Sequence, residues 1–107
     1  MRLGRRDPFG ELVATQLALF AEDESELLHE ALEAEAAWMR AGRDTAEEAY
    51  GDYQLVVDAI ADRLLDVREA YAATLADDAV DAYRRAFASG AAKRFRRYAS
   101  LVADLES

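Results

Sequence analysis

Two pairs of carboxylates are the residues of this sequence best suited to chemistry. Glu30 and Glu33 lie three residues apart. Glu48 and Asp52 lie four residues apart. At either spacing, both members of a pair share one side of an α-helix. Carboxylates from two adjacent helices supply the oxygen ligands that Mg²⁺ and Mn²⁺ prefer, often together with substrate phosphates. The sequence therefore contains a candidate metal site, but the pattern favours the simpler interpretation of a solvated acidic face.

The segments that carry these carboxylates, His29–Glu33 and Glu47–Asp52, resemble the MazG-type all-α nucleotide pyrophosphohydrolases. That family has a Glu-x-x-Glu helix, a spacer and a Glu-x-x-Asp helix, and the resemblance covers residues 25–65. It implies that the four carboxylates bind Mg²⁺ at the phosphates of a nucleoside triphosphate, where a metal-activated water releases pyrophosphate. In this chain the second motif is Glu-x-x-x-Asp, one residue longer, which changes the direction of its ligands.

Other catalytic chemistries are largely excluded by composition. The chain has no cysteine and one histidine, which rules out disulfides, thiolate nucleophiles and a histidine-rich metal site within one chain. Glu26 and His29 form the Glu-x-x-His motif of di-iron bundles, but those sites also need carboxylates from further helices. No nucleophile–base arrangement and no glycine-rich phosphate loop is present. An enzymatic function would therefore depend on carboxylates and a metal ion.

Two further carboxylates, Glu24 and Glu35, fall within the apolar stripe of the first expected helix. A carboxylate removed from water must be paired, protonated or bound to a ligand. We expect each to form a salt bridge with an arginine, or a kink in the helix to expose Glu24. Arg63, Arg68 and Arg84 are the candidate partners.

Basic residues gather near the C-terminus. Residues 7–82 contain 20 acidic and 4 basic residues, a net charge of −16, whereas residues 83–107 contain 6 basic and 2 acidic residues, a net charge of +4. The expected third helix carries Arg85, Lys93, Arg96 and Arg97 on one side, beside aromatic residues. Such a stripe can bind nucleic acid, but the overall charge of −9 opposes it. Ion pairs with the acidic faces of the other helices are the favoured interpretation.

Apolar spacing predicts that three long helices position these side chains. The first opens at Asp7, with Pro8 at the first helical position, and closes before Gly42. Its apolar residues recur at alternating spacings of four and three, and this pattern is interrupted at Glu24. The sequence therefore allows either one continuous helix or a break near Asp23. Trp38 is expected to be a core residue that closes the end of the bundle.

The second and third helices follow after short turns. Thr45–Glu48 matches a capping box, in which the threonine caps the helix and the glutamate reaches back to its N–H. This helix is expected to end near Ala76. Residue 77 or 78, both aspartates, then caps a third helix that continues through Leu105, unless Gly90 breaks it.

The fold class that follows is an all-α antiparallel bundle of three long helices, or four if the last breaks at Gly90. The 107 residues are enough for one helical domain, residues 1–107, with residues 1–6 as a basic tail. No stretch approaches the roughly 18 apolar residues of a membrane span. We therefore expect no membrane partner and a cytoplasmic location.

Apolar residues outside the main stripes indicate a second packing surface. Leu12 and Leu19 flank the stripe of the first helix, and Leu55 and Leu65 face away from that of the second. Because such residues usually cover a partner, we expect a homodimer or higher oligomer. The favoured function is a non-enzymatic protein-interaction or assembly module that needs no cofactor. The alternative is a MazG-type pyrophosphohydrolase that uses Mg²⁺ or Mn²⁺.

Overall fold

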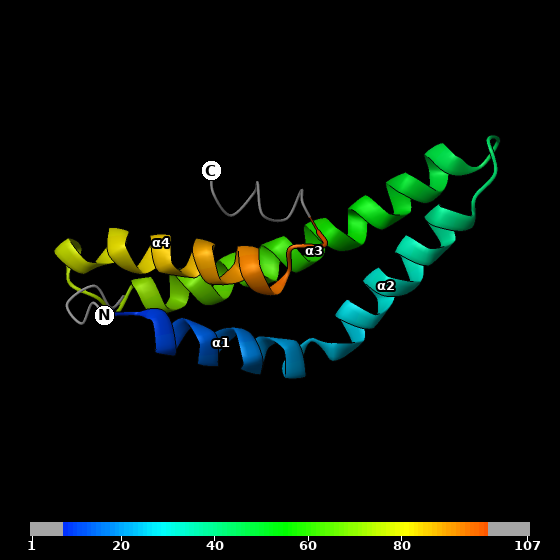
Figure 1. The fold of residues 1–107 in the computed structure, drawn as a ribbon. Coiled ribbons are helices and arrows are strands. Elements are labelled where there is room, and N and C mark those ends of the chain that lie inside the picture. Colours follow the sequence, from blue (N-terminus) through cyan, green and yellow to red (C-terminus); the bar gives the residue numbers. More distant parts are fainter. Residues whose placement is uncertain (1–7, 99–107) are drawn as a thin grey trace, which may run out of the picture.

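The computed structural model describes residues 8–98, and the chain in this range forms four α-helices and no strand (Figure 1). The helices are α1 (Gly10–Asp23), α2 (Ser25–Arg40), α3 (Ala46–Ala72) and α4 (Asp77–Arg94). The all-α class is therefore confirmed. The expected basic tail at residues 1–6 and the expected end of the third helix at Leu105 lie outside the described residues.

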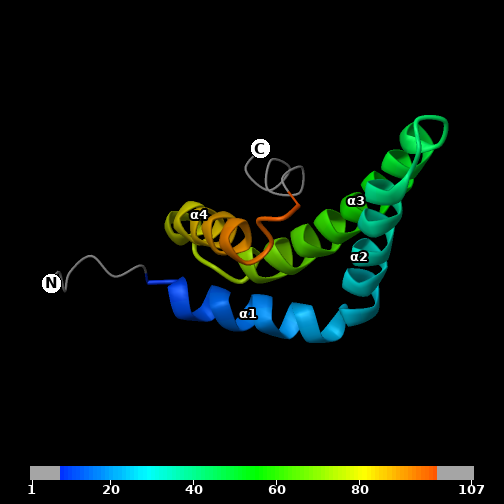
Figure 2. The same ribbon diagram turned by 45° about the vertical axis from the view of Figure 1, so that its right-hand side comes forward.

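The first predicted helix is divided at Glu24 into α1 and α2. Glu24 has φ −108° and ψ 30°, which are not helical values. Its N–H still donates to the Phe20 carbonyl at 2.8 Å, and its own carbonyl accepts from Leu28 at 3.0 Å. The chain therefore bends at this point, and Figure 2 shows α2 turning away from the direction of α1. The sequence signal for a break here is confirmed.

The start of the first helix differs from the prediction. The structure begins α1 at Gly10, with Phe9 as its N-cap, and places Pro8 in the preceding turn. Packing explains the shift, because the Phe9 ring lies edge-on to Tyr83, with 5.5 Å between ring centroids. Asp7, the expected opening residue, lies outside the described range.

The predicted capping box does not form. Thr45 is the N-cap of α3, but it makes no side-chain cap hydrogen bond, and its backbone is αR at φ −114° and ψ −1°. A capping side chain usually needs extended backbone at this position. The Thr45 hydroxyl instead lies 3.5 Å from the Gly42 carbonyl. Glu48 therefore has no capping role here.

The turn between α3 and α4 also differs from expectation. The structure ends α3 at Ala72 rather than near Ala76, and the Thr74 hydroxyl donates to the Tyr71 carbonyl at 2.7 Å. Ala76, whose backbone is extended, is the N-cap of α4. The two aspartates that were expected to cap this helix occupy its first turn. There their negative charges interact favourably with the positive end of the helix dipole.

Gly90 does not break α4. The fourth helix results from the division of the first predicted helix at Glu24. Helix α4 continues through Gly90 to Arg94 because α1 packs closely against it. A Cβ atom at Gly90 would lie 2.8 Å from Val13 Cγ1 and 3.2 Å from Leu17 Cδ1. The glycine therefore permits a close approach between the two helices.

The four helices form a body and an arm. We call α2 together with residues 46–58 of α3 the arm, and α1, α4 and the rest of α3 the body. In the body, α4 packs against α1 and α3, whereas α2 packs mainly against α3. Figures 1 and 2 show the arm extending beyond α4 as two antiparallel helices. The molecule is accordingly elongated, measuring 53 × 32 × 25 Å.

Aromatic side chains fill the centre of the body. Tyr83 is fully buried, and its hydroxyl donates to Gln16 Oε1 at 2.9 Å. Its ring centroid lies 4.9 Å from that of Tyr71 and 6.0 Å from that of Phe87. These contacts hold α1, α3 and α4 together. Among the described helices, none is long and apolar enough to cross a membrane.

Candidate functional site

A groove between α2 and α3 brings together three of the four predicted metal-binding carboxylates. It has a volume of about 500 Å³. Glu30 and Glu33 reach it from α2, and Asp52 reaches it from α3. The remaining lining residues are apolar: Ala34, Ala37, Ala49, Leu55 and Val56. Glu48 does not line this groove and lies exposed in the first turn of α3.

These residues do not fit a metal site within one chain. Between residues 8 and 98, no three His, Asp or Glu side chains are close enough together to hold a metal ion. Glu33 Oε2 instead lies 3.3 Å from Nε2 of His29, and both side chains are exposed. The Glu-x-x-His motif also gains no further ligands. The chemistry implied by the MazG-type resemblance thus has no assembled centre in this part of the chain.

The two carboxylates within the apolar stripe both form salt bridges with arginines. Glu24 Oε1 lies 2.6 Å from Arg63 Nη1, which confirms one of the candidate partners. Glu35 Oε1 lies 2.6 Å from Arg97 Nη2, an arginine outside the candidate set. Arg97 follows the end of α4, where the chain passes beside the arm. The bridges connect the bend to α3 and the arm to the segment after α4, so their role is structural.

An aromatic cluster lies on the arm. The Trp38 ring stacks on that of Tyr53, with 5.5 Å between ring centroids, and lies edge-on to Tyr50 with 4.8 Å between centroids. The ring centroids of Tyr98 and Tyr53 are 6.4 Å apart. Burial raises the pKa of both Tyr53 and Tyr98 above the ordinary value. Their hydroxyls therefore stay protonated at neutral pH and are poor bases. Trp38 is 36% exposed, which corrects the expectation that it closes the core.

The predicted interface residues divide into two groups. Leu12 and Leu65 are half-buried and pack against the chain's own core. Leu19 and Leu55 are exposed, Leu55 to 70%. The structure adds Met39, which is 76% exposed and lies on the arm. Sequence reasoning missed Met39, although an apolar residue directly after Trp38 and outside the stripe was a signal for it.

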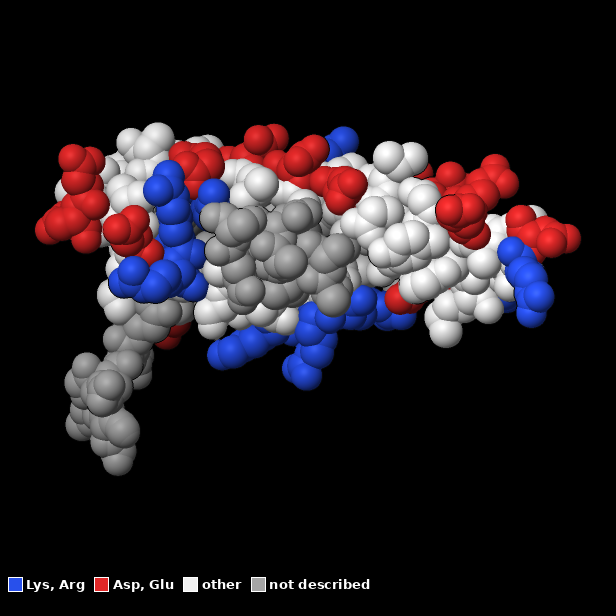
Figure 3. Space-filling model, turned by 90° about the horizontal axis from the view of Figure 1, so that it is seen from above, with Lys and Arg blue, Asp and Glu red and all other residues white. Residues whose placement is uncertain are grey.

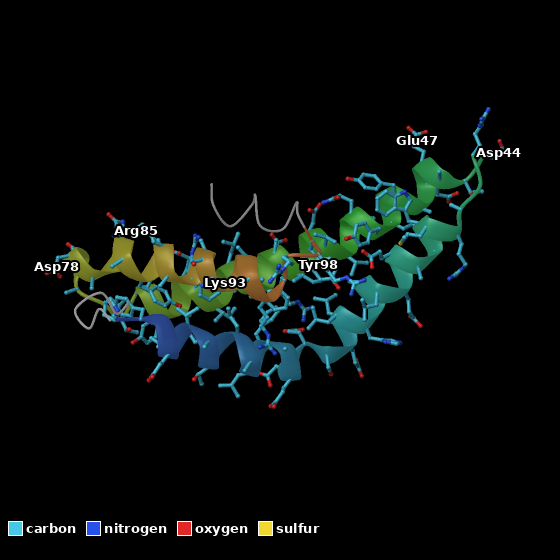
Figure 4. All side chains as sticks on the ribbon, in the orientation of Figure 1. Asp44, Glu47, Asp78, Arg85, Lys93 and Tyr98 are labelled. Atoms are coloured by element: carbon cyan, nitrogen blue, oxygen red, sulfur yellow. The ribbon has the colours of Figure 1, made fainter. Side chains whose placement is uncertain are left out.

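Acidic and basic side chains occupy different sides of the molecule. In Figure 3, acidic residues line much of one long edge and basic residues line much of the opposite edge, while both kinds lie together at the two ends. Figure 4 shows Arg85 and Lys93 on α4, far from Asp44 and Glu47 at the tip of the arm. The predicted pairing of the basic stripe with acidic helices is confirmed for Arg97. Within residues 8–98, Arg85, Lys93 and Arg96 form no salt bridge.

Comparisons with protein-family models, curated proteins and solved structures find no match for this chain. The conclusions about its class therefore come from its own geometry. It is an all-α protein with a three-helix body and an acidic two-helix arm that exposes large apolar side chains.

Proposed function

We propose that this chain is a non-enzymatic helical assembly module that self-associates through its arm. The observation that carries the proposal is the exposure of Met39 and Leu55, at 76% and 70%, on an arm that consists of two helices within residues 8–98. Each side chain gains about 1.5–3 kcal/mol when it moves from water into a packed interface. Exposed apolar groups bordered by charges are typical of protein-interaction surfaces.

The shape of the arm supports this proposal. In the body, α4 packs against both α1 and α3 and so buries apolar side chains from three helices. Over the arm, α2 packs mainly against α3. A second copy laid against the arm would supply further helices, as in bundles of four. Nucleic acid is not among the proposed partners, because the net charge of −9 would repel its phosphates. The cytoplasm stays the predicted location.

Sedimentation velocity on the full chain tests the proposal. We expect the wild type to form dimers or larger species at roughly 100 µM, about 100 times a Kd of 1 µM. The double variant Met39→Glu/Leu55→Glu should be monomeric, because it places charges in the buried part of the interface. Thr15→Glu, which changes an exposed residue of α1, is the control for an added negative charge and should associate like the wild type. A wild type that stays monomeric at this concentration would overturn the proposal.

The second candidate function is a Mg²⁺-dependent nucleotide pyrophosphohydrolase of MazG type. It is supported by the convergence of Glu30, Glu33 and Asp52 on one groove. Thermal unfolding with Mg²⁺ or Mn²⁺, with and without nucleoside triphosphates, tests it. A ligand at about 100 times its Kd adds about 2.7 kcal/mol to stability, which is roughly 10 °C for a domain of this size. Such a shift should disappear in Glu30→Gln/Glu33→Gln, and its absence in the wild type would eliminate this candidate.

A further inference from the structure

We propose that two copies of this chain join head to tail, with the acidic outer face of α3 in one copy seated in the basic groove between α1 and α4 of the next. This inference rests on the proposed self-association and specifies its geometry. On both surfaces, the charged side chains form no salt bridge with another described residue.

The receiving surface is a groove of about 400 Å³ between α1 and α4. Its lining includes the small residues Gly10, Ala14 and Ser89, which allow another helix to approach closely. Lys93 and Arg94 also line it, and neither forms a salt bridge in the described part of the chain. The groove therefore combines an apolar floor with unpaired positive charge.

The entering surface is the outer face of α3, which carries one apolar side chain among acids. Leu55 projects from it at 70% exposure. Asp52 and Asp58 lie three residues to either side of Leu55, and Asp62 follows one turn later, all of them exposed. None of these aspartates forms a salt bridge with another described residue. Leu55 can act as a knob that enters the small-residue floor, while the aspartates meet Lys93 and Arg94.

Charge decides which surfaces can meet. Two acidic faces of α3 would repel each other, and the net charge of −9 adds a general repulsion between copies. An acid-to-base contact reverses that repulsion locally and also fixes orientation. Because both partners of the contact belong to the same sequence, a second copy is the occupant that satisfies both surfaces at once.

The placement of the two surfaces predicts the kind of assembly. Acidic and basic side chains lie along opposite long edges in Figure 3, so one contact leaves a free face at each end of the pair. Such heterologous contacts build rings or open filaments rather than closing at a dimer. We therefore expect species larger than dimers at high concentration and low salt, where electrostatic attraction is least screened.

Two complementary charge-reversal variants test the inference by sedimentation equilibrium. The variant of the outer face of α3 is Asp58→Arg/Asp62→Arg. The variant of the groove is Lys93→Glu/Arg94→Glu. Each alone should raise the dissociation constant about tenfold or more, because like charges then face each other. Mixed in equal amounts, they should again form species larger than dimers, because the reversed face of one variant matches the reversed groove of the other and the two unchanged surfaces match as well. All four substitutions in one chain should restore the larger species.

The controls separate a folding defect from a lost contact. Circular dichroism should show equal helix content in all variants, and Glu11→Arg/Glu22→Arg, a charge reversal of equal size on α1, should associate at least as strongly as the wild type. If the wild type associates but the mixture of the two variants does not regain association, the head-to-tail geometry is wrong and self-association stands. If the wild type is monomeric under all conditions, both proposals fail.

Discussion

At the scale of single residues, Glu69 is the carboxylate between residues 8 and 98 whose pKa departs most clearly from its ordinary value. Arg84 Nε donates to Glu69 Oε2 at 3.0 Å, and Arg68 Nε donates to the same oxygen at 2.7 Å. Hydrogen bonding from Arg84, more than that from Arg68, lowers the pKa of Glu69 from 4.5 to about 2. The interaction connects α3 to α4 through side chains that remain partly exposed.

This shift predicts an acid-sensitive contribution to stability. A carboxylate whose pKa falls on folding stabilises the native state above its unfolded pKa, and this stabilisation is lost as pH falls through the folded pKa. The variant Glu69→Gln should therefore be less stable than the wild type at pH 7, and the difference should vanish between pH 4.5 and about 2. Urea unfolding across this range measures it.

The matched control is Asp66→Asn, which removes an exposed carboxylate that forms no described salt bridge. Its stability should follow the wild type at every pH. Because the Glu69 side chain is 43% exposed, added salt should weaken the effect. A difference between Glu69→Gln and the wild type that persisted at pH 2 would contradict the assignment.

At the scale of elements, two helical glycines should respond oppositely to alanine. Gly51 lies in α3, and a Cβ atom added to it would have no neighbour within 4 Å, so Gly51→Ala should stabilise the fold by about 0.5–1 kcal/mol through helix propensity. In Gly90→Ala the new methyl would meet Val13 and Leu17 of α1. Overpacking of this kind costs about 1–3 kcal/mol, which exceeds the propensity gain. Thermal unfolding of the two variants distinguishes these outcomes, and equal stabilisation by both would show that α1 and α4 are less closely packed.

The same glycine shows where sequence reasoning succeeds and where it stops. The spacing of Tyr53, Val57, Ile60 and Leu64 predicted a helix, and the structure buries all four. The alternative of a break at Gly90 considered only the helix propensity of glycine, a cost of about 1 kcal/mol. It did not include the proximity of Val13, which is 77 residues away in sequence and contacts Gly90 only through tertiary packing.

The candidate site divides in the same way. Spacing correctly placed Glu30 and Glu33 on one side of a helix, and the short turn after α2 brought Asp52 into the same groove. Glu48 shares that side of α3 with Asp52 but lies one turn earlier, in the first turn of the helix, and does not line the groove. The partner of Glu35 was missed since Arg97 comes beside the arm only after α4 has ended.

At the scale of the whole molecule, the division into body and arm predicts unequal local stability. Within residues 8–98 the arm has two packed helices, whereas the body has three, and segments with fewer buried contacts open more readily. One continuous helix, α3, passes through both regions. Amide hydrogen exchange should therefore be faster for residues 47–56 than for residues 60–70 in dilute, low-concentration samples, although all of them are helical.

Association then provides the decisive comparison. If copies join through the arm, raising the protein concentration should slow exchange at residues 47–56, because opening the arm would require its partner to leave. Asp62 should also gain protection in a head-to-tail contact, as it belongs to the acidic outer face of α3, whereas the buried core of the body should change little. The double variant Met39→Glu/Leu55→Glu should show no concentration dependence, which makes it the internal reference. Equal exchange in arm and body at low concentration would mean that the two-helix arm is stable without a partner, and the physical reason for its exposed apolar side chains would then have to be sought elsewhere.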